Sequence, residues 1–432
     1  MSSLSDVALA IVDCEHKTAP TQLCGIPSIR TTNIRNGRLD LESANRVSEE
    51  TYREWTARME PRVGDLILAR EAPVGEVGIV PSGTRVCLGQ RTVLVRPDPD
   101  QAVPRYLLYL LLTPEMQHEL KARSEGSTTP HLNVEDIRRF ELPELPELPH
   151  QQRIAHILGT LDDRIELNRR MNRTLEAIAR AIFKSWFVDF DPVHAEAKGC
   201  DPVGMDPQAA ALFPDSFQDS PLGKIPQGWQ ATTLGEICEK PQYGYTQSAA
   251  EEPVGPRFLR IKDINKQPWI EWAAVPYCEI DEANYDKYRL RAGDIVVARI
   301  ADPGHAALIR ADVDAVFASY LIRFRLLDQS YSHFVQYWLK SPGYWALVRA
   351  RRSGSTRGNL NAKVLSGFPV LVPPAALAER FRLAVEPLAK MTDGLLAENA
   401  NLSAARDVLL PKLLSGDLDV GNLPVPKDRC DE

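Results

Sequence analysis

The sequence predicts an α+β protein with an internal pseudo-two-fold repeat, in which two mixed α/β domains are separated by an antiparallel pair of long coiled-coil helices. Three observations predict this fold class. Short sequence motifs recur in order about 228 residues apart, apolar runs alternate with turn residues in the front part of each copy, and a long apolar stripe closes each copy. Such a period is too long for a solenoid, so it indicates two copies of one larger plan.

The repeat is clearest around two Gly-Asp turns. Residues 63–70 (VGDLILAR) match residues 292–299 (AGDIVVAR) at a separation of 229 residues. A chance similarity of turns would not be expected to place further matches in the same order. These further matches join residues 4–7 with 234–237, 29–34 with 259–264, 113–114 with 341–342, 126–128 with 354–356, and 132–133 with 360–361.

Each copy begins with short strands. In the first copy, residues 65–70, 77–80 and 92–95 are rich in Val, Ile and Leu and lie between Gly, Pro and Asn, as the strands of a mixed sheet do. A helix is expected at residues 104–123. The front part of each copy is therefore predicted to be a mixed α/β domain.

Each copy ends with the pattern of a coiled-coil seam. After proline-rich residues 142–149, which cannot be a helix interior, residues 151–187 contain no proline and only Gly159 as an interior breaker. Seam side chains recur at alternating steps of three and four, and the second copy repeats the alternation. The predicted seam residues are Leu158, Leu161, Ile165, Asn168, Asn172 and Leu175 in the first helix, and Leu388, Met391, Leu395, Leu402 and Leu409 in the second.

Two packings are compatible with these stripes. Each helix could cover its own globular domain, as most amphipathic helices do. Matching stripes in a duplicated chain favour mutual packing instead, with Asn168 and Asn172 fixing the register at some cost in stability. The predicted scheme has α/β domains at residues 1–149 and 225–376, spacer helices at 150–188 and 377–418, a Pro- and acid-rich linker at 189–224, and a tail at 419–432.

Composition indicates a globular protein. The chain has 432 residues, of which 44% are hydrophobic and 25% charged, and its formal net charge is -7. This acidic total does not exclude nucleic acid, because only the charge of the contacting surface matters. The odd number of cysteines, with no Cys-x-x-Cys pair, favours reduced thiols. The sequence shows neither a signal peptide nor a long apolar segment, so we expect a cytoplasmic protein without a membrane partner.

Motifs for catalysis and cofactor binding are not found in the sequence. It has no phosphate-binding loop, dinucleotide-binding glycine motif, nucleophile elbow or Asn/Asp-Pro-Pro-Tyr/Phe tetrapeptide. Cys14, Glu15 and His16 lack a second ligand pair at a spacing that suits a metal. The Glu-x-Lys pairs at residues 15–17 and 119–121 are of a kind common on solvated surfaces. We therefore expect no catalytic residue, metal or cofactor in this chain.

Local positive charge favours a DNA partner. Residues 346–363 and 25–38 each carry arginines and no acidic residue. Arginine binds phosphate or guanine edges and Asn suits adenine edges, although each segment alone is also typical of a solvated basic surface. The candidate DNA-binding residues are Arg30, Thr31, Asn33, Arg35, Arg260, Lys262, Arg349, Arg351, Arg352, Arg357 and Asn361.

Several motifs are typical of one protein family. Residues 225–229 (IPQGW) are followed by residues 234–237 (LGEI), residues 161–170 read LDDRIELNRR, and residues 409–416 read LLPKLLSG. With these motifs, nearly the whole chain resembles the specificity subunit of type I restriction-modification enzymes. The first copy departs from the family pattern because it lacks the Pro-x-Gly-Trp opening.

The resemblance implies a DNA-reading adapter without an active site. In this family each target-recognition domain reads one half of a bipartite double-stranded DNA sequence, while the paired helices separate the halves and dock two methyltransferase subunits. Those subunits bring S-adenosylmethionine and methylate adenine, and a restriction/translocase subunit uses ATP and Mg. The Arg357→Ala change is expected to relax the reading of one half-site only.

Three other functions are compatible with parts of the pattern. The chain could be the specificity chain of a related fused restriction-methylation system, which the identity of the neighbouring partner gene would reveal. A stand-alone nuclease or methyltransferase would act without partners. A protein scaffold built on the coiled coil would form complexes that select no DNA sequence.

Overall fold

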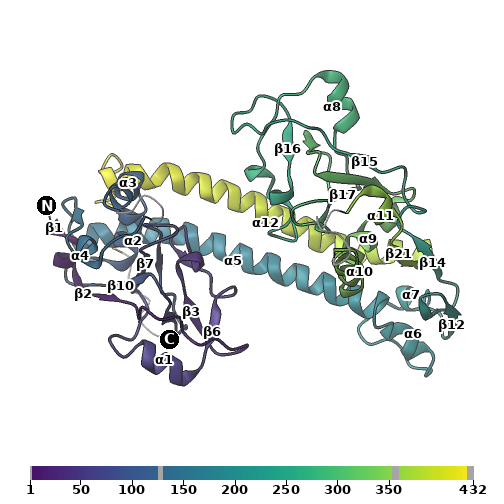
Figure 1. Cartoon of the computed structure of the whole chain (residues 1–432), viewed down its shortest axis with the longest axis horizontal. Helices are drawn as coiled ribbons and strands as arrows, with labels where there is room; N and C mark the ends of the chain where they lie inside the picture. The colour runs from purple at the N-terminus through teal and green to yellow at the C-terminus, as the bar shows by residue number, and fades with distance from the viewer. Residues whose placement is uncertain (1, 125–129, 353–359, 426–432) are drawn as a thin grey trace. The chain divides into compact units, whose positions relative to one another are not determined.

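The computed structural model shows a chain of short strands and helices together with two much longer helices (Figure 1). The long helices are α5 (Leu148–Phe187) and α12 (Ala375–Ser415). The structure describes residues 2–124, 130–352 and 360–425, with the exception of the side chain of Arg352.

The chain divides into two compact units. Unit 1 comprises Met1–Glu166 and Asn401–Glu432, and unit 2 comprises Leu167–Ala400. Each long helix contributes one part to unit 1 and the other part to unit 2. The units therefore differ from the predicted linear scheme, which treats the spacer helices as separate from the domains.

A four-stranded sheet forms the centre of unit 1, and its strands include the three that were predicted, but the sheet is antiparallel throughout and not mixed. In its third strand Leu66 and Leu68 pack into one hydrophobic cluster, while Ile67 and Ala69 pack into another. Alternate side chains of a strand point to opposite faces, so this sheet is covered on both sides. The strand order is β2 (Ala8–Asp13), β10 (Thr92–Pro97), β7 (Leu66–Ala69) and β8 (Val77–Ile79).

Smaller elements surround this sheet. β3 (Ile26–Ile29) pairs in parallel with β9 (Cys87–Leu88) and antiparallel with β6 (Asn45–Val47). Two further antiparallel pairs join β4 (Ile34–Arg35) with β5 (Arg38–Leu39), and β1 (Ser2–Ser3) with β11 (Glu141–Leu142). The short helices are η1 (Leu4–Val7), η2 (Thr31–Asn33), α1 (Glu49–Trp55) and α4 (Val134–Arg138).

The single helix expected at residues 104–123 is two helices, α2 (Pro104–Leu111) and α3 (Pro114–Ala122). Pro114 has no backbone N–H and disfavours a helical conformation at the preceding residue, so the first helix ends there. Thr113 then caps the second helix, because its hydroxyl accepts a hydrogen bond from the Met116 N–H at 3.4 Å.

Unit 2 repeats this plan. Its four-stranded sheet has the order β15 (Gln242–Tyr243), β20 (Leu321–Arg325), β17 (Asp294–Ala298) and β18 (Ala306–Leu308). β16 (Arg257–Leu259) is parallel to β19 (Ala315–Phe317), and β14 (Gln230–Thr233) pairs with β21 (Pro369–Val372). The helices are η3 (Ile261–Asp263), η4 (Trp272–Ala274), α8 (Glu282–Tyr288), η5 (Gln329–Tyr331), α9 (Ser332–Trp338), α10 (Pro342–Arg352) and α11 (Ala362–Ser366).

The repeat extends to single hydrogen bonds at the two Gly-Asp turns. Gly64 and Gly293 have φ values of +88° and +87°, a conformation that favours glycine. Buried Asp65 accepts a hydrogen bond from the Arg62 N–H at 2.8 Å, and buried Asp294 accepts one from the Arg291 N–H at 3.0 Å. The same carboxylates bind Arg96 and Arg325, respectively, through two hydrogen bonds each. The sequence motif thus specifies one turn that both copies use.

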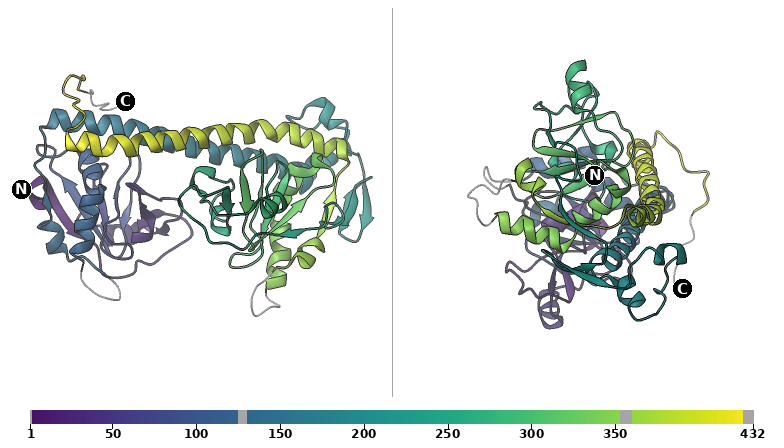
Figure 2. Two further views of the ribbon diagram at one scale, coloured as in Figure 1. Left: turned by 90° about the horizontal axis from the view of Figure 1, so that it is seen from above. Right: turned by 90° about the vertical axis from the view of Figure 1, so that its right-hand side faces the viewer.

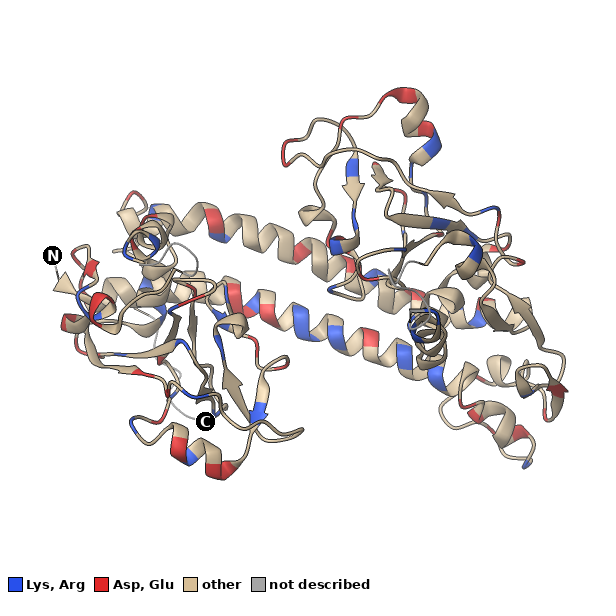
Figure 3. Ribbon diagram, in the orientation of Figure 1, with Lys and Arg blue, Asp and Glu red and all other residues tan. Residues whose placement is uncertain are grey.

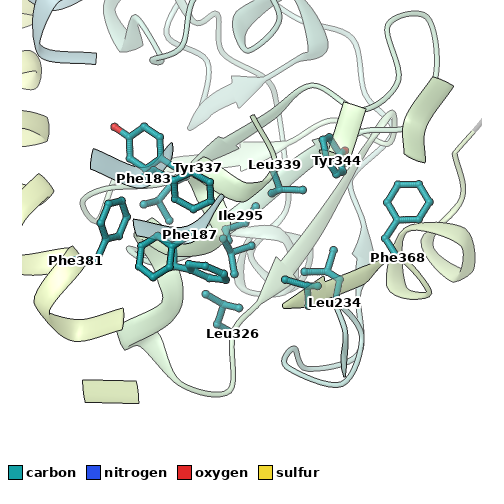
Figure 4. Packing of buried hydrophobic residues seen from close by; sticks show 14 of the residues in the cluster. Phe183, Phe187, Leu234, Ile295, Leu326, Tyr337, Leu339, Tyr344, Phe368 and Phe381 are labelled. Atoms are coloured by element: carbon teal, nitrogen blue, oxygen red, sulfur yellow. The ribbon is translucent and has the colours of Figure 1, made fainter. Parts of the chain in front are cut away.

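Aromatic side chains join the long helices to the domain core in unit 2 (Figure 4). The ring of Phe187 in α5 lies 5.0 Å from Phe334 of α9 and 5.1 Å from Phe381 of α12. Phe183 also contacts both of these rings. Burying aromatic rings in this way strongly stabilises a core. The two packings that the stripes allowed therefore occur together, because each helix contacts the other helix and the domain.

The predicted linker is a folded segment of unit 2. It contains α6 (Asp191–Glu196) and α7 (Pro207–Ala210), followed by a hairpin of β12 (Phe217–Ser220) and β13 (Gly223–Pro226). Val193 and Phe213 are buried in the same core as the aromatic rings, and Phe213 lies 5.5 Å from Trp186. A few apolar residues among the prolines are enough to hold the segment on the core.

The unit 2 parts of α5 and α12 lie side by side (Figure 2). At one end Asn168 Nδ2 donates a hydrogen bond to Asn399 Oδ1 at 3.0 Å, and at the other Phe183 contacts Phe381 with ring centroids 5.9 Å apart. Later residues of α5 therefore meet earlier residues of α12, so the helices are antiparallel. Asn168 and Asn172 are fully buried at this interface, as the register hypothesis requires.

The predicted seam of the second helix needs a correction at Met391. This side chain is 52% exposed, whereas its neighbour Thr392 is buried between half-buried Leu388 and buried Leu395. Hydrophobicity alone favours Met391, but the Thr392 hydroxyl donates to the Leu388 carbonyl oxygen at 3.0 Å and is thereby satisfied inside the seam. Of the other predicted residues, Leu158, Ile165 and Leu175 are buried, and Leu161, Leu402 and Leu409 are half-buried.

In unit 1, the same helices pack through Leu158 of α5 and Leu413 of α12, which share one core cluster. An ion pair between Arg406 and Asp162, at 2.9 Å, lies beside this contact. α12 continues through Pro387, whose side chain is exposed. Proline removes one helical hydrogen bond, and at an exposed position water can satisfy the free carbonyl group.

Candidate nucleic-acid interface

Equivalent tight turns hold Arg30 in unit 1 and Arg260 in unit 2. The Arg30 N–H donates to Asn33 Oδ1 at 3.1 Å, and the Arg260 N–H donates to Asp263 Oδ2 at 2.8 Å. Asn33 is buried. Thr31 is buried too, and its hydroxyl donates to the Ala72 carbonyl oxygen at 3.3 Å. Of the predicted residues in the first turn, Thr31 and Asn33 therefore support the backbone, and Arg30 faces solvent.

The remaining basic candidates differ in their surroundings. Arg260 forms two hydrogen bonds with Asp263, at 3.0 and 3.1 Å, so much of its charge is compensated. Arg35 in β4 and Lys262 in η3 are exposed. Figure 3 shows Lys and Arg distributed over both units and along α5 rather than gathered on one element. Charge alone therefore does not mark one DNA-binding surface.

The basic segment at residues 346–363 is described only in part. Arg349 and Arg351 are exposed in the last turns of α10, where positive charge suits the helix C-terminus. Arg357 and the side chain of Arg352 lie outside the described residues. Asn361 is exposed and caps α11, because its Oδ1 atom accepts a hydrogen bond from the Val364 N–H at 2.9 Å.

In unit 2 the structure places Asn361 beside residues that the sequence analysis missed. We call this place the unit 2 corner and define it by Tyr243, Arg299, Tyr320 and Asn361. The Arg299 N–H donates to the Tyr320 carbonyl oxygen at 3.0 Å, and the Arg299 carbonyl oxygen accepts from the Leu360 N–H at 2.9 Å. The Arg299 guanidinium stacks over the Tyr243 ring, 5.0 Å from its centroid. Three strand ends and the start of α11 therefore meet here.

Unit 1 has an equivalent corner, which we define by Asp13, Arg70, Gln90 and Arg91. The Arg70 N–H donates to the Arg91 carbonyl oxygen at 2.8 Å, and the Arg70 carbonyl oxygen accepts from the Leu132 N–H at 3.0 Å. These two bonds correspond to those of Arg299. The Arg70 guanidinium, however, binds both oxygens of Asp13 at 3.0 Å. A polar hollow of about 220 Å³ opens at this corner and is lined by His16, Arg70, Glu71, Gln90 and Arg91.

Arg70 and Arg299 end the most similar motif of the two copies, and this signal could have identified them. From the sequence alone the motif predicts only a strand and a turn, because it lacks the local excess of basic residues that marks the other candidates. Arg30 lies near the unit 1 corner, since its Cγ atom is close to Gly89, the residue before Gln90. One predicted residue therefore lies close to the residues that the sequence did not indicate.

In unit 1 a cluster of charged side chains attaches the domain to α5. The Tyr109 hydroxyl donates to Asp162 Oδ2 at 2.7 Å, and Arg105 binds Asp163 through two hydrogen bonds at 2.7 and 2.8 Å. Gly159 is explained by this contact, because a Cβ atom there would lie 2.3 Å from Arg105 Nη1. Gly159, which has no side chain, therefore leaves space for the Arg105 side chain on the surface of α5.

In unit 2 a buried ion pair makes the corresponding attachment. Tyr337 stands 228 residues after Tyr109, and its hydroxyl donates to Glu176 Oε2 of α5 at 3.2 Å. Lys340 Nζ lies 2.9 Å from Glu176 Oε1. Burial lowers the pKa of Lys340 to about 8, against the attraction of Glu176. Burial also acts to raise the pKa of Glu176, but Lys340 and Arg180 outweigh it and hold that pKa below its ordinary value.

Cys14, Glu15 and His16 are held by different partners. Burial raises the pKa of the Cys14 thiol, Glu15 pairs with Arg58 at 3.4 Å, and His16 lies 3.1 Å from Asp13. Within the described part of the chain, His, Cys, Asp and Glu side chains form no group of three or more that could hold a metal ion. No helix in this part is long and apolar enough to cross a membrane.

Comparison with known proteins gives relatives of similar length. The chain is 28% identical over 405 residues to the MjaIX specificity subunit of a type I restriction enzyme from Methanocaldococcus jannaschii. The alignment covers 87% of this chain and 82% of that protein. It is also 28% identical over 374 residues to the HindI specificity subunit from Haemophilus influenzae, covering 76% of this chain and 80% of that protein.

The fold has a counterpart among solved structures. The S subunit of a type I restriction-modification system from M. genitalium matches with a TM-score of 0.57 and 16% identity over 95% of both chains. The family described as type I restriction modification DNA specificity domain matches residues 24–177 and again residues 226–378. These two matches correspond to the two copies of the repeat and cover most of the sequence. The chain therefore belongs to the type I restriction-modification DNA specificity family and is a specificity subunit with two target-recognition domains.

Proposed function

We propose that each unit reads one half of a bipartite double-stranded DNA sequence. The observation that carries this proposal is the pair of equivalent corners. Their backbone hydrogen bonds are the same, but Asp13, Gln90 and Arg91 in one corner differ in chemistry from Tyr243 and Tyr320 in the other. A common framework with different side chains suits two similar domains that select different bases. The two half-sites are therefore expected to be unequal.

We propose further that the chain supplies DNA selection while partner subunits supply the chemistry. Two methyltransferase subunits would bring S-adenosylmethionine and methylate adenine, and a restriction/translocase subunit would use ATP and Mg. The relatives are specificity subunits of restriction enzymes, which supports this division. On this proposal the chain itself carries no catalytic residue and no cofactor.

The helix pair is proposed to set the number of unread base pairs between the half-sites. A straight helix of the length of α5, which has 40 residues, extends about 60 Å. One turn of duplex DNA is about 34–36 Å, so a strut of this length can separate two recognition domains along DNA. Packing of α5 against α12 within each unit supports a stiff strut.

The test is to express the chain with its adjacent methyltransferase subunits and to map the methylated adenines in the host DNA. The expected result is two short specific sequences separated by a gap of fixed length. A second complex carries four extra residues, about 6 Å of helix, in the spacer. The gap should lengthen by one or two base pairs and both half-sites should stay the same. Altered half-sites, or a single continuous sequence in the unmodified complex, would contradict the proposal.

A further inference from the structure

Arg299 is a partly buried cation without a counter-ion among the described residues. Its guanidinium stacks on Tyr243, and its Nε atom is buried and has no hydrogen-bond acceptor in that part of the chain. Removing a charged donor from water without an acceptor costs free energy. The fold keeps this arginine in place nevertheless, through the backbone bonds to Tyr320 and Leu360.

Arg70 occupies the same place in unit 1 but has an acidic partner. Its Nη1 atom binds both oxygens of Asp13 at 3.0 Å, and its Nε atom donates to the Leu132 carbonyl oxygen at 2.8 Å. The duplicated chain therefore offers an internal comparison. One framework arginine is neutralised by a carboxylate, and the other has its donors free of any acidic partner in the described structure.

A single exchange between the copies accounts for the missing carboxylate. Asp13 pairs with Val93 in the unit 1 sheet, and Tyr243 pairs with Ile322 in the unit 2 sheet. Val93 and Ile322 are themselves 229 residues apart, which is the separation of Arg70 and Arg299. Asp13 and Tyr243 are thus equivalent positions. Where unit 1 has a carboxylate, unit 2 has an aromatic ring, which contacts the guanidinium without consuming its hydrogen-bond donors.

We propose that Arg299 reads a guanine in the half-site of unit 2, whereas Arg70 is a framework residue of unit 1. This inference rests on the proposed function of the two units. A guanidinium contacts guanine through two donors aimed at O6 and N7, which requires a fixed and planar fork. The Tyr243 ring, whose centroid lies 5.0 Å from the guanidinium carbon, restricts where the guanidinium can lie. A phosphate contact can use the same fork, but it carries no base preference, so the two contacts differ in the test below. Exposed Tyr320 and Asn361 then lie at the rim of the same contact.

The test uses the complete complex with its methyltransferase subunits. The methylation map of the unmodified complex first defines the two half-sites. Competition binding then uses duplexes in which each base pair of each half-site is replaced in turn. Arg299→Met is expected to abolish the preference for one G·C pair in one half-site, a loss of roughly 5- to 150-fold in discrimination. The other half-site should keep its preferences.

Two variants separate a base contact from other effects. Arg299→Lys keeps the charge but loses the planar fork, so it should weaken the guanine preference less than the Met variant does, because a lysine can also contact guanine O6 and N7. Arg257→Met is the matched control, because Arg257 also stacks on a tyrosine, Tyr277, at 4.2 Å but donates to the Ala273 and Val275 carbonyl oxygens. The control should retain every base preference.

Each outcome decides one question. If the unmodified complex shows no bipartite sequence, the proposed function fails whatever Arg299 does. If the sequence is bipartite and Arg299→Met retains the same discrimination at every position, the inference about Arg299 is wrong. A uniform loss of affinity of Arg299→Met for all duplexes, with every base preference unchanged, would show a phosphate contact and would also overturn it.

Discussion

The buried ion pair between Lys340 and Glu176 should be the main polar link between the unit 2 domain and α5. Their side chains are 11% and 9% exposed, respectively. Removing one member of a buried pair leaves an uncompensated charge, which typically costs about 3–5 kcal/mol. Arg180 still contacts Glu176 at 2.8 Å, so Lys340→Met is expected to lower the free energy of unfolding of unit 2 by about 3 kcal/mol.

The double variant Glu176→Leu/Lys340→Met separates the cost of an orphaned charge from the net value of the pair. Replacing both charges with apolar side chains of similar size is often close to neutral. Tyr337 loses one hydrogen bond, worth about 1 kcal/mol. We therefore expect the free energy of unfolding of the double variant to lie within about 1 kcal/mol of that of the unmodified chain. Adding Glu176→Leu should thus recover about 2 kcal/mol of the stability that Lys340→Met loses.

Tryptophan fluorescence during urea unfolding measures this effect, because every tryptophan except Trp55 lies in unit 2. The matched control is Lys390→Met, which breaks a pair with Glu386 at 3.0 Å in which the lysine side chain is 74% exposed. That change should cost less than about 1 kcal/mol. The reasoning is refuted if Lys340→Met costs no more than the control, or if the double variant is as unstable as the single one.

Three further predictions concern unit 2. Burial lowers the pKa of His333 to about 4, against an ordinary value of 6.5, so the unfolded chain binds a proton that the folded chain excludes as the pH falls from 6.5 to 4. Stability should fall by up to about 3 kcal/mol across this window, and urea titrations should show a smaller fall for His333→Gln. Phe381→Ala should lower the free energy of unfolding by about 3–5 kcal/mol in the same assay, because Phe381 is buried. The control Leu383→Ala, at an exposed position, should lower it by less than about 0.5 kcal/mol, and equal losses would count against the shared core. Asn172→Leu should stabilise the unit by about 1–3 kcal/mol, because the buried Asn172 amide has no hydrogen-bond partner among the described residues; a lower unfolding midpoint would oppose this.

Sequence periodicity predicts most of the architecture because the repeated motifs each have one structural solution. A Gly-Asp turn with a positive φ and a buried carboxylate recurs wherever its motif recurs, so two matching motifs place two matching strands. The seam of α5 is predicted because side chains at alternating steps of three and four residues lie on one face of a helix. In α12 the same reasoning fails at Met391, because hydrophobicity does not indicate that the Thr392 hydroxyl can be satisfied inside the helix.

The candidate interface is less accessible to sequence reasoning. Local charge identifies Arg30 and the arginines of α10, but it does not show that Thr31 and Asn33 are buried by their own turn. It also cannot distinguish Arg70 from Arg299. Their difference depends on partners more than fifty residues away in the sequence, which only the sheet pairing brings close.

The most direct test of the account is the map of methylated adenines made by this chain with its methyltransferase partners, in which the two units are changed one at a time. The account predicts one sequence of two unequal parts with a fixed gap, and a change in unit 2 should alter one part only. A map in which a change confined to unit 2 alters both parts, or in which no gap exists, would contradict the division of DNA reading between two equivalent domains.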